Sequence, residues 1–269
     1  MILLETLARL FPEASRRSLK QWLDQGRVEV NRQVARDGRA TVRAADQVTL
    51  GRRGAVPFPP ALGLVHEDAD LLVIEKPPGL LTIGSEQERE RTAYSLLWDY
   101  LQGQRPPRRP FIVHRLDRET SGLLVVAKSL RAKRHLQAQF EARDVERIYV
   151  AVVEGRVSED QGMLESRLVQ DRGLRVRAGA RGRLAITHYR VLERRRDATV
   201  LELSLGTGRR QQIRVQLADL GHPIIGDVAH GGRLARPGRL HLHARRLGFV
   251  HPGTGKRMHV ESAPPAGWV

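Results

Sequence analysis

The sequence predicts an α+β protein with a small N-terminal domain and a larger C-terminal domain. Strand-like and helix-like segments are mixed without the regular strand–helix–strand alternation of a doubly wound parallel sheet. Residues 54–63 contain three prolines and no charged residue, which is typical of a semi-rigid linker. We therefore expect one domain over residues 1–53, a linker over 54–63 and a second domain over 64–269.

Composition favours a globular protein that binds nucleic acid. Hydrophobic residues make up 41% of the 269 residues, which is enough for a core and argues against wholesale disorder. Lys and Arg number 46 against 30 Asp and Glu, and the net charge of +16 favours a phosphate-bearing partner. The chain has no cysteine, which excludes disulfides and thiolate metal sites. Because no apolar run reaches about 18 residues, we expect a cytoplasmic protein without a membrane partner.

The first domain is predicted to contain a basic helix followed by strands. Ser15 is suited to cap a helix that runs to Gln25, because its hydroxyl can accept from a free amide of the first turn. The buried stripe of this helix consists of Leu19, Trp22 and Leu23. The basic residues that lie off the stripe are Arg16, Arg17 and Lys20. Residues 27–31 and 46–50 show the composition and alternation of short strands.

The second domain mixes further strands and helices. Helices are predicted over residues 92–102, from an amphipathic pattern, and over 130–142, where Ser129 can act as the cap. The predicted strands are residues 70–76, 147–154, 198–203 and 240–244. They are rich in β-branched residues and are bounded by turn residues.

The ten residues from His114 to Leu123 form the most informative motif. They place Asp117 between Arg115 and Arg118, in a polar turn that leads into an apolar segment. Neighbouring positive charge favours the charged form of a carboxylate. That property suits a nucleophile or base in a site that attracts an anionic polymer. The structural alternative is a solvated loop with an ordinary salt bridge.

A second polar segment, residues 207–217, is predicted to begin a helix that Thr207 caps. The residues expected on its buried face are Ile213, Leu217 and Leu220. Arg214 falls at the boundary of that face, where an unpaired charge is costly and a carboxylate partner is needed. Asp117 is the preferred candidate, and Asp227 is the alternative.

Several segments taken together resemble the RluA-type pseudouridine synthases. In order along the chain, they are residues 72–80, 114–123, 147–155, 207–227, and 241–244 with 251–256. Residues 1–53 resemble the S4 RNA-binding domain. The resemblance implies a catalytic domain with a mixed, mainly antiparallel sheet, preceded by a small α/β RNA-binding domain. It also implies RNA as the partner, a monomer, and no cofactor or metal.

The resemblance assigns roles to individual residues. Asp117 would be the nucleophile or base that permits cleavage of the uridine glycosidic bond. Tyr149 would pack on the uracil ring and could relay the proton that leaves carbon 5. Arg214 would pair with Asp117, and Ile213 would form an apolar wall of the pocket. Arg115 would enter the RNA stack in place of the extruded uridine, because the base must leave its stack before its glycosidic bond can be reached.

Further contacts with RNA are expected beside these residues. His114 and Arg118 would bind the substrate, while the basic residues of the first domain would hold RNA more generally; these are Arg16, Arg17 and Lys20. The function implied is conversion of specific uridines in structured RNA, above all ribosomal RNA, to pseudouridine. The alternatives are the same chemistry on tRNA, or a non-catalytic RNA-binding or ribosome-assembly factor with this fold.

The chain departs from the family pattern at several positions. Gln211 and Gln216 stand where histidines are common, and His230 stands where tyrosine is expected. These positions are predicted to surround the pocket and to affect the choice of substrate. His241 and His243 would share one face of a strand, but no clear carboxylate or cysteine completes a metal site there.

Overall fold

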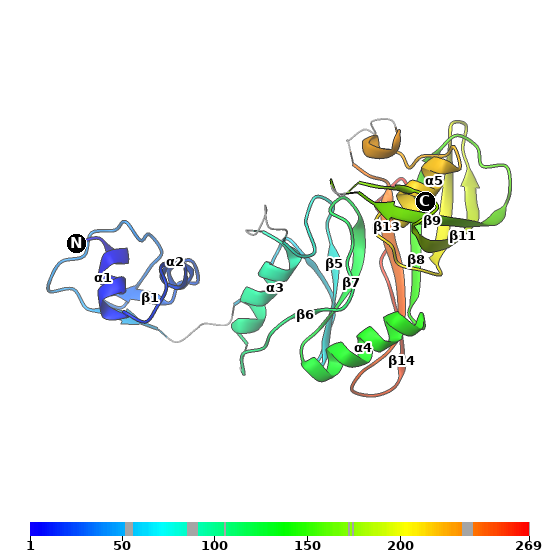
Figure 1. Ribbon diagram of the computed structural model, residues 1–269. Coiled ribbons are helices and arrows are strands. Elements are labelled where there is room, and N and C mark those ends of the chain that lie inside the picture. The colour runs from blue at the N-terminus through cyan, green and yellow to red at the C-terminus, as the bar shows by residue number, and fades with distance from the viewer. Residues whose placement is uncertain are drawn as a thin grey trace. The chain divides into compact units, whose positions relative to one another are not determined.

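The computed structural model describes residues 1–51, 56–84, 91–104, 106–171, 173, 175–232 and 239–268 (Figure 1). Its backbone divides into two compact units, Met1–Phe58 with Asp99–Arg108, and Pro59–Trp98 with Arg109–Val269. The domain limits expected from the sequence stay a prediction, and residues 52–55, which include the start of the expected linker, lie outside the described residues.

The first unit packs two helices against a three-stranded antiparallel sheet of order β2-β1-β3. Its elements are α1 (Leu3–Leu10), α2 (Arg16–Asp24), β1 (Val28–Val30), β2 (Gln33–Ala35) and β3 (Val48–Leu50). Ser15 caps α2 as predicted, because its Oγ accepts from the backbone N–H of Ser18 at 3.1 Å. Leu19 and Leu23 of α2 are buried against Leu3 and Leu7 of α1, a helix that was not predicted.

The turn between β1 and β2 has an unusual backbone. Asn31 and Arg32 have φ values of 53° and 68°, so both lie in the left-handed region that a tight hairpin turn requires. Asn31 suits its position, because its side chain bonds Asp46 and the N–H of Gln47 at 2.9 and 3.0 Å. Arg32 occupies a position where glycine would be free of strain.

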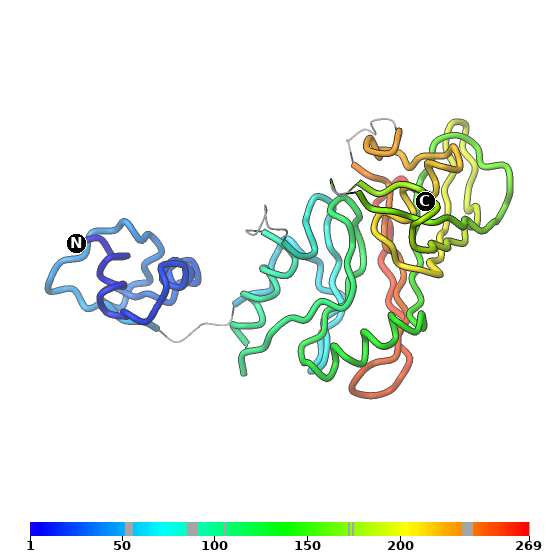
Figure 2. The backbone as a smooth tube through the Cα atoms, viewed as in Figure 1, coloured from blue at the N-terminus to red at the C-terminus, as the bar shows by residue number. Residues whose placement is uncertain are grey.

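The second unit is built on an eleven-stranded mixed sheet, with helices α4 (Leu130–Ala142) and α5 (Gln212–Asp219), and the short 3-10 helix η1 (Val228–His230) (Figure 2). Helix α3 (Ala93–Gln102) begins in this unit, and its residues from Asp99 onward belong to the first unit. The first strands along the chain are β4 (Gly63–Glu67), β5 (Leu71–Lys76), β6 (Phe111–Ile112), β7 (Ser121–Ala127), β8 (Glu146–Glu154) and β9 (Gln161–Gln170). The later strands are β10 (Val176–Ala178), β11 (Arg183–Arg194), β12 (Ala198–Leu205), β13 (Leu242–Val250) and β14 (Arg257–Glu261).

The strand order is β10-β9-β11-β12-β8-β13-β7-β5-β4, while β14 pairs with β13 and β6 pairs with β7. Among the described strands, the β13–β7 pairing alone is parallel. The expected α+β class with a mainly antiparallel sheet is therefore confirmed. No helix of the described residues is long and apolar enough to cross a membrane.

The parallel contact between β7 and β13 depends on Gly122. This residue has φ +110°, and a Cβ built on it would lie 2.3 Å from the carbonyl oxygen of Ala244. A side chain would therefore force the two strands apart. Because β7 begins four residues after Asp117, the close contact fixes the strand into which the Asp117 turn leads.

The core beside this junction is made by α4. Ser129 caps α4 as predicted, accepting from the N–H of Ala132 at 3.1 Å. Ala132 and Leu136 are buried against Leu123 of β7 and Phe249 of β13. Thr207, in contrast, does not cap α5; the helix begins after Gln211, whose φ is 53°. The Oγ1 of Thr207 instead lies 2.6 Å from the Oε1 of Gln212 and accepts from the N–H of Ile186.

Candidate active site

A cavity of about 490 Å³ lies in the second unit and brings together residues from distant parts of the sequence. Six of the seven residues predicted to act in catalysis or substrate binding line it: His114, Arg115, Asp117, Tyr149, Ile213 and Arg214. They come from the turn before β7, from β8 and from α5. Arg118, also expected to bind substrate, is exposed and is not among the lining residues.

The Asp117 turn is held by buried groups on both sides. Thr82 Oγ1 donates to the carbonyl of Leu116 at 2.9 Å, and it accepts from the N–H of the same residue at 3.2 Å. Lys76, which is fully buried, donates from Nζ to the carbonyl of Arg118 at 3.0 Å and to two further carbonyls at 2.8 Å. Burial lowers the pKa of Lys76 to about 8, against the opposing charges of Glu119 and Asp117. The backbone on each side of Asp117 is thereby fixed.

His114 anchors the same turn. Its Nε2 accepts from the backbone N–H of Val125 at 3.0 Å, and its ring stacks on Phe140 with centroids 4.7 Å apart. Burial, helped by the charge of Arg147, lowers the pKa of His114 to about 3. The ring is therefore neutral at physiological pH. It lines the cavity, but its accepting nitrogen is already bonded to the backbone of β7.

Arg214 does not pair with Asp117, so the preferred prediction was wrong. Its Nε and Nη2 donate to the two carboxylate oxygens of Asp227 at 2.7 and 2.6 Å, the alternative that the sequence left open. Asp227 is only 1% exposed, and a buried carboxylate of this kind requires a countercharge. Burial opposes the charge of Arg214, but the pair with Asp227 raises the pKa of Arg214, and the more distant Asp117 and Glu119 add to this effect.

Asp117 is consequently left without an ion pair in the described part of the chain. Its charge still acts on groups from three elements, because it adds to the rise in the pKa values of Tyr149 and Arg214 and opposes the lowering of the pKa of Lys76 by burial. A half-buried carboxylate that faces a cavity and is not engaged by a cation is free to react with a ligand.

Tyr149 forms a buried aromatic wall of the cavity. It lies in β8, between Leu203 of β12 and Ala244 of β13, and is 8% exposed. Burial raises its pKa to about 12, although the charge of Arg147 acts in the opposite direction. The phenol is therefore protonated at neutral pH and can donate a hydrogen bond.

Arg147 is a residue of the site that sequence reasoning missed. It precedes Tyr149 by two residues on β8, so both side chains lie on the same face of the strand and both line the cavity. The sequence signal was the charge itself, since an arginine next to the apolar run 148–153 is unusual in a buried strand.

Known proteins share this architecture. The family model for RNA pseudouridylate synthase matches residues 70–219, and the S4 domain model matches residues 3–48. The chain is 37% identical to the ribosomal large subunit pseudouridine synthase D of Pseudomonas aeruginosa, over 96% of this chain and 87% of that protein. The protein of the same name from Vibrio cholerae is 36% identical, over 97% and 87%.

The solved structure of human RNA pseudouridylate synthase domain containing 4 has a TM-score of 0.64 and 27% identity, and it covers 76% of this chain and 89% of that one. The chain belongs to the RNA pseudouridylate synthase family. It is thus a pseudouridine synthase whose substrate is RNA, with an S4 domain at its N-terminal side, as the resemblance of the sequence predicted.

The departures from the family pattern lie in different places within this synthase. Gln211 lines the cavity. Gln216 does not: it is buried in α5, where its Nε2 donates to the carbonyls of Leu164 and Ala185 at 3.1 and 3.0 Å. His230 is also outside the cavity lining, and its Nδ1 lies 3.0 Å from Asp227. The prediction that all three surround the pocket was therefore wrong for two of them.

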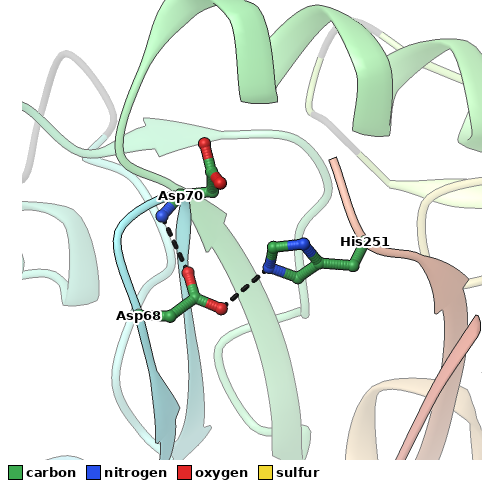
Figure 3. A group of neighbouring side chains, drawn as sticks. All are labelled: Asp68, Asp70 and His251. Carbon is green, nitrogen blue, oxygen red and sulfur yellow. Dashed lines mark hydrogen bonds and ion pairs between the residues drawn. The ribbon is translucent and has the colours of Figure 1, made fainter. Parts of the chain in front are cut away.

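The synthase also contains a cluster with metal-ligand residue types, formed among the described residues by Asp68, Asp70 and His251. Figure 3 shows Asp68 hydrogen-bonded to both of the others. Its Oδ2 lies 2.8 Å from the Nε2 atoms of both His251 and His66, and its Oδ1 accepts from the N–H of Asp70 at 2.7 Å. These atoms already bond one another, so the cluster links the turn before β5 to the residue that follows β13.

In the S4 domain, Arg16, Arg17 and Lys20 are exposed on α2, as their spacing predicted. Leu19 and Leu23 face the core of that unit. The three cations are thus accessible to a ligand.

Proposed function

We propose that this synthase converts specific uridines of ribosomal RNA to pseudouridine, with Asp117 as its catalytic residue. The observation that carries the proposal is an unpaired carboxylate in a cavity that is otherwise rich in arginine. Such a cavity attracts an anionic polymer and offers it one reactive oxygen nucleophile or base.

The chemistry is an isomerisation. The bond between C1′ of the ribose and N1 of uracil breaks, the base rotates, and a new bond joins C1′ to C5. The proton on C5 is lost and N1 gains one, so atoms and electrons balance without a cofactor. Asp117 would act as nucleophile or base in the first step. The anchored turn, held by Thr82 and Lys76, would keep its carboxylate aimed at the sugar.

The other residues would receive the base after it leaves the RNA stack. The ring of Tyr149 would pack against uracil, and Ile213, which is 5% exposed, would form the apolar wall. Arg115, exposed beside Asp117, would fill the space that the uridine leaves. Arg214 would support the site indirectly, through its pair with Asp227.

The S4 domain would bind RNA through Arg16, Arg17 and Lys20. We propose domains over residues 1–53 and 64–269, and a monomer that acts in the cytoplasm. Ribosomal RNA is favoured because the two bacterial relatives are named for the large ribosomal subunit. Pseudouridine synthesis on tRNA is the competing possibility for the target.

The decisive experiment compares wild type with Asp117→Asn, which keeps the size of the side chain and removes its charge. Each protein is incubated with unmodified large-subunit ribosomal RNA and with unmodified tRNA, and pseudouridines are mapped. Wild type should modify discrete positions in the ribosomal RNA, while Asp117→Asn should bind RNA without forming pseudouridine. A near wild-type rate for Asp117→Asn would refute the assignment of Asp117, and modification of tRNA alone would refute the target.

The role of the S4 domain is tested by replacing Arg16, Arg17 and Lys20 together with alanine. RNA affinity should fall most at low salt, and the slope of log affinity against log salt should flatten by roughly 0.7 to 0.9 for each phosphate that the variant no longer binds. Pseudouridine formation at saturating RNA should persist. Superimposable titrations of wild type and variant would show that these cations do not contact RNA.

A further inference from the structure

Arg147 is a buried cation without an acidic partner. Its side chain lines the cavity, yet the residue is 9% exposed and forms no ion pair with any described residue. Its Nη2 donates to the carbonyl of Leu205 at 3.2 Å, while its Nε is buried and has no hydrogen-bond partner. Leaving a buried guanidinium uncompensated is costly, so a fold that keeps one implies that an anion pairs with it at some stage.

The surroundings of Arg147 increase the need for an anion. Burial lowers the pKa of Arg147, Tyr149 opposes this effect, and the nearby positive charge of Arg143 adds to it. Arg209 and Arg210 line the same cavity, where Glu141 is the one acidic lining residue besides Asp117 among the residues that the structure describes. The stacked ring of Phe140, with its centroid 5.9 Å from Cζ, is an apolar neighbour that adds no formal charge.

Gly208 leaves one side of the guanidinium accessible. This glycine is exposed, and a Cβ at its position would lie 2.6 Å from Nη1 of Arg147. An incoming group can therefore approach Nη1 where any other residue would place a side chain. The Nη1 atom makes no hydrogen bond with the described residues, so its N–H groups are available for such a group.

We propose that Arg147 binds a backbone phosphate of the RNA beside the target uridine, with Nη1 as the contacting atom. This inference rests on the proposed function of the cavity and adds a substrate-binding residue to it. A phosphodiester supplies the full negative charge that a buried guanidinium needs, and arginine matches its geometry. Uracil and ribose are neutral and would leave the charge of Arg147 uncompensated.

The test compares Arg147→Met with Arg156→Met, both on an Asp117→Asn background so that RNA is not converted during titration. Arg156 is exposed on the same unit and is absent from the cavity lining, so its variant controls for the loss of one charge. The probe is an unmodified transcript of large-subunit ribosomal RNA, titrated at several salt concentrations. Melting of each free protein is recorded in parallel.

Relative to the control, Arg147→Met should bind RNA roughly 10- to 100-fold more weakly at low salt. Its slope of log affinity against log salt should be flatter by about 0.7 to 0.9, the value for one phosphate contact. The free Arg147→Met protein should melt no lower than wild type, because an uncompensated buried charge has been removed. Equal affinity, or weaker binding with an unchanged slope, would overturn the proposal.

Gly208→Ala is a second variant that tests the same contact if Arg147→Met does not fold. Its Cβ would displace Nη1 while every charge remains, so RNA affinity should fall and the salt slope should flatten. Wild-type binding by Gly208→Ala would overturn the proposal. Because the measurements need no turnover, failure of wild type to form pseudouridine in a separate assay would refute the proposed function without deciding the role of Arg147.

Discussion

Arg214 and Asp227 form a bidentate ion pair at the wall of the cavity, with N–O distances of 2.7 and 2.6 Å. Both residues are buried, and His230 adds a third polar contact at 3.0 Å. Burial favours the neutral form of Asp227, but Arg214 and His230 prevail and lower its pKa to about 2. This pair leaves the carboxylate of Asp117 free to meet the substrate.

Breaking this pair should destabilise the protein strongly. Asp227→Asn leaves Arg214 as an uncompensated buried charge, and the free energy of unfolding should fall by about 3 to 5 kcal/mol. Urea unfolding of the variant measures the loss. Arg190→Ala, which breaks the partly exposed pair with Glu202, is the control and should cost no more than about 1 kcal/mol. Similar losses in the two variants would contradict a special contribution of the buried pair.

Tyr149→Phe tests the role of the hydroxyl of Tyr149, because the substitution keeps the aromatic ring and removes the hydroxyl. The phenol is protonated at neutral pH, because burial raises its pKa to about 12. If the hydroxyl relays the proton from carbon 5, the single-turnover rate should fall by about 10²-fold or more, as expected for loss of a proton-transfer group, with little change in RNA affinity. Tyr189→Phe, a buried tyrosine outside the cavity, should leave the rate unchanged. Equal rates for wild type and Tyr149→Phe would assign Tyr149 to packing alone.

His114 should make stability depend on pH. Its pKa is about 3 in the folded protein and 6.5 ordinarily, so between these values the unfolded chain binds a proton that the folded chain does not. Its contribution is therefore complete above pH 6.5 and is lost as the pH falls towards 3.

The measurement is the free energy of unfolding between pH 6.5 and 4.5 for wild type and His114→Gln. The slope for wild type should be steeper, by an amount approaching about 1.4 kcal/mol per pH unit for one proton. His188→Gln, at an exposed histidine, should keep the slope of wild type. Identical slopes for wild type and His114→Gln would mean that His114 titrates normally in the folded protein.

Arg32→Gly should stabilise the first unit. The left-handed backbone at φ 68° destabilises a residue that has a side chain by about 1 to 2 kcal/mol. Glycine avoids this cost, but its greater conformational entropy in the unfolded chain offsets part of the gain. We expect a net gain of up to about 1 kcal/mol, measured as slower hydrogen exchange of the amides in β1. Gln33→Gly, in the adjoining strand, should act in the opposite direction. Faster exchange in Arg32→Gly would mean that the Arg32 side chain stabilises the turn.

Local patterns in the sequence determined much of this protein. Ser15 and Ser129 were recognisable as helix caps, since a cap bonds an amide three residues away. The strand of Tyr149 was recognisable from its β-branched neighbours, and the α+β class followed from the order of such segments. The motif around Asp117, together with the other four segments, was sufficient to predict the family and six of the residues that line the cavity.

Only the tertiary structure decided how the charges of the cavity are paired. Both Asp117 and Asp227 were available to Arg214, and the choice depends on which carboxylate the fold brings within 3 Å of the guanidinium. The isolation of Arg147 was equally hidden, because it depends on how far the fold keeps the described acids, Glu141 of α4 included, from the guanidinium. Ion pairing of buried groups is set by contacts between segments far apart in the chain, and spacing along the sequence does not encode those distances.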